Sequence, residues 1–581
     1  MPDPNENEVI VRQEGRDEQG RPVASTRLTP DADARECVVL CESDNVIPIV
    51  FLPGIMGTNL RGASGGGSVW RPPNLDGVMP VLGAIGTMIG FFFRGPATRQ
   101  RRLDPRNTEI DDRGPIDAEG AISKQEARAR RWGTLMRSAY HPVMSLMQCQ
   151  LNALMENCEL LGEWRDGMLY RREPADYGEQ NGVDALTEAE IKHAAKYRFE
   201  VWGGGYNWLQ SNDDSGKEIQ AYINDVVLQH YRDELGEAAA AQMKVILVTH
   251  SMGGFVARAL TSTPAESDLA AGKAVGLAAD SDNILGAVLG VMPATGAPAT
   301  YKRMRSGFES VAKIILGRNA AEVTAVMGNS PGALELLPTA DYGEGGQERE
   351  CAWLKLGGPS GSNAWTYALP REGDPYEEIY KSRSWYGLVP AHNEGLLDPA
   401  QKNAGKQSDE FGGEWSIWTE FDLKIDEVKR FHNAVFRHYP VPAHVHYGDD
   451  STQLAWSEVH WDGSALPADG RAESFQVQDD NGKDRLRLNV SDAVVTLRIA
   501  DQGGYGDETV PALSGRAPGQ ADVAANFRQG DQGSGMHADA NGKGRTKGYG
   551  HQDSYNDPRT QWATLYGIVK IAQEAKWACE S

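Results

Sequence analysis

"VILVTHSMGGFVARAL", residues 245–260, is the stretch that decides the fold. An apolar run ends at His250, a serine follows among small residues, and a segment rich in Ala, Leu and Arg comes next. This pattern is typical of a nucleophile elbow, in which Ser251 occupies a strained turn between a strand and a helix. Gly253 meets the need for a small residue after the serine, whereas Thr249 stands where glycine is commoner and is expected to crowd the turn.

A second loop points to the same chemistry. The apolar run "VIPIVFLPG", residues 46–54, stops at Pro-Gly and continues as "IMGTNL", which predicts a buried strand entering a tight loop. Such a loop can present a backbone N–H opposite the elbow, so we expect the amides of Ile55 and Met252 to form an oxyanion hole. Without this loop, a chance serine after an apolar strand would be the competing interpretation.

Strands and helices alternate along the chain. Further short apolar runs predict strands at 244–250, 283–293 and 442–448, and apolar residues at helical spacing predict helices at 217–228 and 559–577. This alternation predicts a mostly parallel sheet covered by helices on both faces. Residues 515–550, rich in Gly, Asp, Gln and Asn, are expected to form a long surface loop.

A serine nucleophile needs a general base, and the chain has 12 histidines. His551 lies in the glycine-bounded "GYGHQDSYNDP", after the predicted strands and before the closing helix. His537 in the same region is the next choice. His250 adjoins the serine, but neighbouring residues on an elbow project in different directions, so it ranks third.

The acid that orients the histidine is less distinct. Asp507 lies in "GYGDETVPALSG", after the β-rich "AVVTLRIA". On local grounds alone an aspartate here is a turn former. The order nucleophile, acid, histidine along the chain favours the catalytic interpretation, with Glu508 as the substitute.

Composition excludes several classes of partner. The chain of 581 residues carries 58 basic and 81 acidic residues, a net charge of -23, so nucleic acid is not expected to bind. The polar, acidic start lacks the pattern of a signal peptide, so we expect a cytoplasmic location before any direct delivery. "DDNGKD", residues 479–484, lacks the spaced glutamate of a calcium loop, and we expect neither metal nor cofactor.

The uncharged segment "VMPVLGAIGTMIGFFF", residues 78–93, has two interpretations. It is too short to span a bilayer comfortably, so it is either a buried core helix or a lid that faces lipid. The net negative charge opposes attraction to anionic membranes, which leaves apolar insertion as the driving force. We therefore predict that Phe91, Phe92 and Phe93 help to form a lid or a membrane-facing surface.

Seven motifs together resemble one family. They occur in the family's order over about residues 46–575 and read "VFLPGIMGTNL", "WGTLMRSAYHPV", "WGGGYNWLQS", "VTHSMGG", "GVMPATGAPA", "VHYGDDST" and "GDETVPALS". The chain is thereby similar to the lecithin:cholesterol acyltransferase-like lipases, in the wider group that holds lysosomal phospholipases, glycosylphosphatidylinositol inositol-deacylases and bacterial lipases.

The resemblance implies an α/β-hydrolase fold and a triad of Ser251, Asp507 and His551. It implies a lipase or phospholipase that cleaves acyl esters of membrane lipids. An acyltransferase using the same triad and a catalytically silent binding module are the alternatives. Asn207 stands where the family has an aspartate, so any role of that carboxylate is lost.

Large acyl-ester hydrolases with this motif pattern and no expected signal peptide look similar to antibacterial lipase effectors of type VI secretion systems. That likeness implies a secretion apparatus, a neutralising immunity protein, and delivery to a target-cell periplasm or membrane. The expected layout is a polar leader at 1–45 and a catalytic domain at 46–581. Insertions are expected at about 62–130 (the lid candidate), 300–440 (a cap) and 450–550 (a late β-rich and loop elaboration).

Overall fold

A parallel six-stranded sheet forms the centre of the computed structural model. The structure describes residues 45–63, 65–71, 95–156, 159–161, 164, 171–262, 283–309, 317–344, 351–359, 365–403, 416–468, 471–530 and 549–577, and four short strands before residue 45. In spatial order the central strands are β11 (Arg198–Gly203), β5 (Val46–Leu52), β12 (Val245–His250), β13 (Ile284–Gly290), β16 (Ala443–Gly448) and β23 (Ala525–Gln529). All neighbouring pairs are parallel. The four strands predicted from apolar runs are confirmed as β5, β12, β13 and β16.

Both faces of this sheet are buried, which explains why its strands read as continuous apolar runs. In β5, Val50 and Leu52 join one hydrophobic cluster, whereas Ile49 and Phe51 join another. The helices of the first face are α6 (Asn212–Tyr222), the π-helical turn η5 (Ile223–Leu228), α7 (Gln229–Leu235) and α9 (Gly253–Thr261); those of the second are α4 (Arg137–Gln150), α5 (Glu188–Ala194) and α18 (Pro558–Ala572). The predicted helix at 217–228 is therefore confirmed, the one at 559–577 is confirmed as far as Ala572, and the molecule has the α/β-hydrolase fold.

The expectation of a long surface loop at 515–550 is wrong for its first part. Residues 525–529 form β23, the edge strand beside β16, and Ala525 and Phe527 are buried. Polar Asn526 and Gln529 hide this strand in the sequence, but the buried carboxylate of Glu179 accepts the amide N–H of Asn526 at 3.3 Å. Residues 531–548, which include His537, lie outside the described residues.

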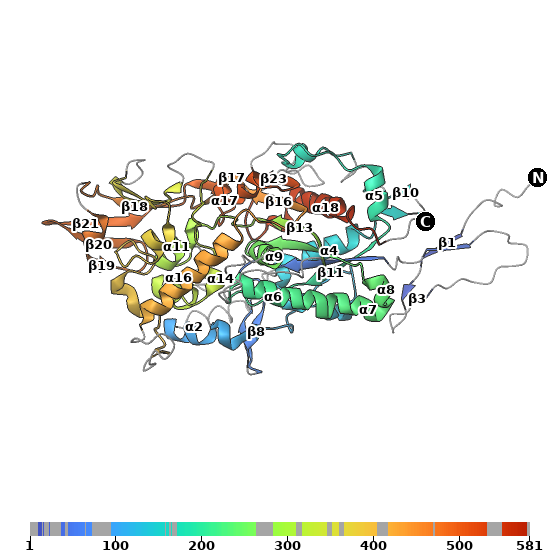
Figure 1. Cartoon of the computed structure of the whole chain (residues 1–581), viewed down its shortest axis with the longest axis horizontal. Coiled ribbons are helices and arrows are strands. Elements are labelled where there is room, and N and C mark those ends of the chain that lie inside the picture. The colour runs from blue at the N-terminus through green and yellow to red at the C-terminus, as the bar shows by residue number, and fades with distance from the viewer. Residues whose placement is uncertain are drawn as a thin grey trace, which may run out of the picture.

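A second body, here called the cap, lies at one end of the long axis in Figure 1. Its sheet has the order β15 (Tyr367–Leu369), β14 (Leu354–Pro359), β18 (Val459–Gly463), β21 (Ala493–Ile499), β20 (Arg485–Val490) and β19 (Gln476–Asp480). Four helices pack with it: α11 (Pro298–Ser306), α13 (Ala320–Met327), α14 (Pro331–Leu334) and α16 (Ile417–Ala434). Because β14 pairs with β18, segments before and after the core strand β16 build one cap sheet.

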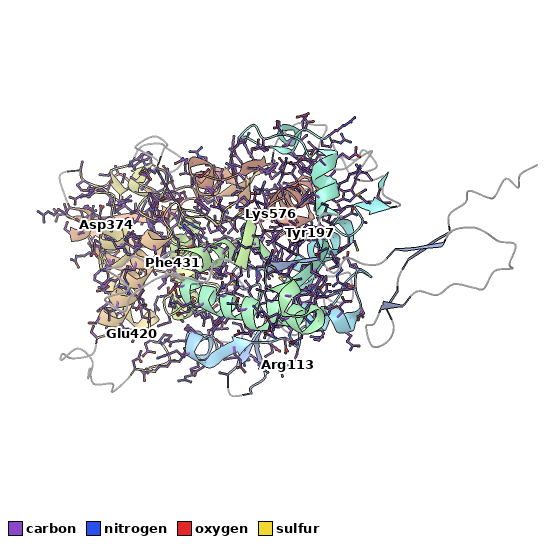
Figure 2. All side chains as sticks on the ribbon, turned by 45° about the vertical axis from the view of Figure 1, so that its right-hand side comes forward. Arg113, Tyr197, Asp374, Glu420, Phe431 and Lys576 are labelled. Carbon is purple, nitrogen blue, oxygen red and sulfur yellow. The ribbon has the colours of Figure 1, made fainter. Side chains whose placement is uncertain are left out.

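The cap packs against the core through buried aromatic groups. Phe431 on α16 and Phe255 on α9 contact edge to face, with ring centroids 5.9 Å apart. In Figure 2 Phe431 lies toward the middle of the molecule, whereas Asp374 and Glu420 lie toward the cap end. Tyr197, which precedes β11, and Lys576 lie on the core side in the same view. Among the described helices, none combines the length and apolarity needed to cross a bilayer.

Candidate active site

The serine of the predicted elbow lies between β12 and α9. Ser251 has φ of 54°, in the left-handed region, and its amide N–H donates to Gly290 O at 2.8 Å. A Cβ on Gly253 would lie 2.5 Å from Leu52 O, so only glycine fits beside β5. Thr249 lies inside β12 in ordinary strand conformation, and its carbonyl accepts the Tyr555 hydroxyl at 2.7 Å. The departure from glycine at residue 249 is therefore accommodated by the strand.

The structure brings Ser251, His551 and Asp507 together in one hydrogen-bonded series. His551 Nε2 lies 2.9 Å from Ser251 Oγ, and His551 Nδ1 lies 2.8 Å from Asp507 Oδ2. A carboxylate only accepts, so Nδ1 carries the hydrogen and Nε2 presents a lone pair to the serine hydroxyl. Ser251 is 4% exposed and Asp507 is fully buried, so water hardly competes for these contacts.

Asp507 is both a turn former and the partner of the histidine. Its Oδ1 accepts the amides of Thr509 at 3.1 Å and Val510 at 2.7 Å, while Oδ2 faces His551. The main chain repeats the link, because His551 N–H donates to Asp507 O at 2.7 Å. The two interpretations of this residue from sequence are thus compatible.

The runner-up residues take other places. Glu508 has φ of 78°, and burial, followed by the neighbouring Asp507, raises the pKa of its carboxyl. His551 Nδ1 contacts Asp507 and not this neighbour. His250 directs its two nitrogens to Tyr140 Oη and His551 O, so it does not hold the serine hydroxyl.

The predicted oxyanion loop is a tight turn, residues 54–57, here called the oxyanion turn. Gly57 N–H closes it by donating to Gly54 O at 3.0 Å, and Met56 at its third position has φ of 65°. Within the described residues no acceptor is found for the amide N–H of Ile55 or of Met252. Among the residues that the structure describes, both predicted donors are therefore free to bind an oxyanion.

Side chains from distant segments hold the oxyanion turn on several sides. Tyr206 Oη donates to Pro53 O at 2.7 Å, Trp70 Nε1 donates to Met56 O at 2.8 Å, and Gly54 N–H donates to Tyr140 Oη at 3.2 Å. The sequence patterns do not predict these three hydrogen bonds, although the resemblance places Tyr206 beside the active site. Tyr140 and Tyr206 do lie in two of the quoted motifs, which was the available signal.

Asn207 has a structural role that an aspartate could not fill. Its Nδ2 donates to Pro105 O and Thr108 O at 3.2 Å each, and its Oδ1 accepts Leu209 N–H at 3.3 Å. A carboxylate has no hydrogen to donate to the two carbonyl oxygens. The amide thus joins the loop that follows β11 to the start of β8 (Thr108–Ile110) and the turn before it.

Other predicted features lie elsewhere or outside the described part. Phe91, Phe92 and Phe93 belong to residues 72–94, which the structure does not describe. Of residues 479–484, the first two end β19 and residues 481–484 form the turn to β20, where Asn481 Oδ1 accepts three backbone amides. Among the described residues, no group of three His, Cys, Asp or Glu side chains is arranged to hold a metal ion.

Comparison with known proteins places this arrangement in context. A chain in the solved structure described as "The crystal structure of Tle4-Tli4 complex" is similar, with 39% sequence identity and a TM-score of 0.75. The similarity covers 91% of the present chain and 99% of that chain. No family model matches the sequence, and no curated protein sequence matches it significantly.

Proposed function

The chain belongs to the Tle4 family of α/β-hydrolases, and we propose that it is a lipase or phospholipase that cleaves acyl esters of membrane lipids. The observation that carries the proposal is the series Ser251 Oγ, His551 and Asp507, joined by contacts of 2.9 and 2.8 Å. A free serine hydroxyl is a weak nucleophile near neutral pH, and this imidazole lies within reach of its proton.

The proposed reaction has two steps. Ser251 Oγ attacks the ester carbonyl while His551 Nε2 takes its proton, and the imidazolium then protonates the departing alcohol. Asp507 stabilises that imidazolium, and the amides of Ile55 and Met252 donate to the oxyanion. Water attacks the acyl-enzyme with His551 as base and releases the fatty acid, which restores the serine.

Access to a bilayer is the second element of the proposal. With a net charge of -23, attraction to anionic head groups cannot bring the protein to a membrane. Insertion of apolar side chains into the bilayer can bring the protein to the membrane, because each large side chain that is buried contributes roughly 1.5–3 kcal/mol. We assign this insertion to the apolar segment 78–93 and in particular to Phe91, Phe92 and Phe93.

We further propose that the protein is delivered by a type VI secretion system to the periplasm or membrane of a target cell. The similar protein was solved as the Tle4-Tli4 complex, and by analogy an immunity protein would neutralise this chain. Expression in a bacterial periplasm should therefore be toxic, and Ser251→Ala should remove the toxicity. Harmless expression of active enzyme would argue against the antibacterial role.

Labelling by a fluorophosphonate tests the hydrolase proposal directly. The full chain should be labelled at Ser251 and should release fatty acid from mixed phospholipid and glyceride vesicles, as measured by mass spectrometry. Ser251→Ala should lose both properties. A folded protein that takes no label would instead be a binding module, and acyl transfer to an added alcohol without net fatty acid release would indicate a transferase.

A further inference from the structure

We propose that His250 and Tyr140 are positioning residues that hold the oxyanion turn and the main chain of His551 in register with Ser251. This inference rests on the proposed hydrolase function and assigns two residues that the triad does not include. Its basis is one chain of hydrogen bonds that passes behind the nucleophile.

Three contacts make up this chain. Gly54 N–H donates to Tyr140 Oη at 3.2 Å, and Tyr140 Oη lies 3.2 Å from His250 Nδ1. At the other side of the ring, His250 Nε2 lies 3.0 Å from His551 O. Tyr140 and His250 are each 2% exposed, so solvent does not replace these partners.

The chemistry of the end groups fixes the direction of every bond. The carbonyl of His551 only accepts, so His250 Nε2 must carry the hydrogen. Burial, followed by the nearby His551, lowers the pKa of His250 to about 3, so the ring is neutral and Nδ1 is an acceptor. Tyr140 therefore donates its hydroxyl hydrogen to Nδ1 and accepts from Gly54 N–H, and the Gln552 side chain is a further hydrogen-bond partner of the same hydroxyl. Burial also raises the pKa of Tyr140 to about 12, which keeps that hydrogen in place.

Close packing leaves the residues of this hydrogen-bond series little room to move. A Cβ on Gly54 would lie 2.8 Å from His250 Nδ1 and 2.9 Å from Ser251 Cβ, so the turn packs directly on both residues. The rings of His250 and His551 have centroids 4.9 Å apart. A displacement of the His250 ring therefore moves the oxyanion turn or the His551 main chain, and misplacement by about 1 Å can cost roughly a hundredfold in rate.

Removing the links one at a time tests the proposal. Tyr140→Phe keeps the ring and deletes the hydroxyl, and we expect kcat on a soluble short-chain p-nitrophenyl ester to fall about 10- to 100-fold. KM should change less than about threefold, because ground-state binding is spared. His250→Phe should cost at least as much, and His250→Gln, which keeps an N–H donor, should recover part of the loss.

The double variant tests whether Tyr140 and His250 act through one series of hydrogen bonds or independently of each other. Tyr140→Phe with His250→Phe should have the kcat of His250→Phe alone, because the second change breaks a chain that is already broken. Losses that multiply would overturn the proposal. So would a kcat within about twofold of wild type in folded Tyr140→Phe.

Tyr231→Phe is the matched control for a lost buried hydroxyl. Tyr231 Oη accepts from Trp202 Nε1 at 2.9 Å and donates to Glu200 at 2.6 Å, so, like Tyr140, it is a buried hydroxyl that both accepts and donates. Its melting temperature should fall, while its kcat should match wild type. If Tyr140→Phe behaves in the same way, its role is structural only.

A spectroscopic measurement tests the hydrogen-bond chain without relying on turnover. In ¹⁵N-histidine NMR spectra of the full chain, the signal lost in His250→Phe should show the neutral Nε2–H tautomer between roughly pH 5 and 9. An Nδ1–H tautomer, or protonation in that range, would overturn the inference. Absence of ester hydrolysis by wild type would instead contradict the proposed function, with the tautomer still measured.

Discussion

The strands of the core and the strands of the cap differ in how deeply they are buried. Strands β5 and β12 are buried along their whole length, whereas β20 alternates between covered and open positions and β21 is mostly exposed. The core positions Ser251 and His551, and Asp507 follows at the point where the chain has returned from the cap. The difference indicates that the core fixes the geometry of the site and that the cap can vary around it.

The two regions are nevertheless joined by a buried polar contact. Glu335, at the end of the cap helix α14, accepts Asn212 N–H at 2.8 Å and the Ser211 hydroxyl at 2.7 Å. Asn212 is the first residue of α6, where helix amides lack partners of their own, and Ser211 is the N-cap residue before it. A carboxyl group of the cap body thus accepts hydrogen bonds from the N-cap residue and the first residue of core helix α6, so the separation between the regions is incomplete.

The largest effect should come from the core. Asp507→Asn keeps the Oδ1 acceptor of the turn but favours the wrong tautomer of His551, and kcat should fall about 10⁴-fold with little change in melting temperature. Steady-state kinetics and a thermal melt measure the two quantities. A comparable loss of stability would mean that the turn, rather than the histidine, depends on this carboxylate.

A smaller effect is expected from the lid segment. Replacing Phe91, Phe92 and Phe93 together by Ser should weaken binding to liposomes about a thousandfold or more, since three insertions at about 1.5 kcal/mol each are lost. Hydrolysis of a short soluble ester should be spared. Flotation with vesicles and a soluble assay distinguish the outcomes, and joint loss of both through misfolding would support the core-helix interpretation.

Gly54→Ala tests how closely the oxyanion turn packs against Ser251. Its Cβ would lie 2.9 Å from Ser251 Cβ, so the oxyanion turn must move and kcat should fall about a hundredfold. Gly395 in the cap is the matched control, because a Cβ there meets nothing within 4 Å. Equal kcat values for the two variants would remove the contrast between the regions.

The smallest effect concerns the contact between Glu335 of the cap and the start of α6 in the core. Burial raises the pKa of Glu335 from 4.5 to about 8, so the folded protein holds a proton that the unfolded chain releases. The contribution of this proton to the free energy of unfolding is complete below about pH 4.5. It is lost as the pH rises to 8, at about 1.4 kcal/mol per pH unit. Denaturant unfolding at pH 6 and pH 7 should show a difference of about that size, which Glu335→Gln should abolish. Identical differences in the two proteins would contradict the assignment.

Core strands could be predicted because continuous apolar runs carry a strong signal. The same signal failed for β23, where Asn526 and Gln529 interrupt the pattern. The main-chain N–H of Asn526 donates to Glu179 and the Gln529 side chain donates to Tyr177 O, and both partners lie far away in the sequence. The single cap sheet was also missed, since nothing local shows that β14 will pair with β18 across an intervening core strand.

For the site, sequence order alone indicated which residues meet. Ser251 and His551 are 300 positions apart, yet each lies in a motif with a fixed place in the chain. The supporting contacts were not predictable in the same way, because they depend on ring orientation. Tyr140, for example, reaches both Gly54 and His250 only through the packing of α4 on the sheet.

The spacing of 300 residues between Ser251 and His551 also bears on synthesis. A ribosome that adds about 5–20 residues per second needs roughly 15–60 s to proceed from one to the other. During that interval the nascent chain exposes its serine without a proton acceptor, and the open edge of β16 still awaits β23. Competence to attack a substrate therefore requires that His551 has been synthesised and that β23 and α18 have docked on the sheet.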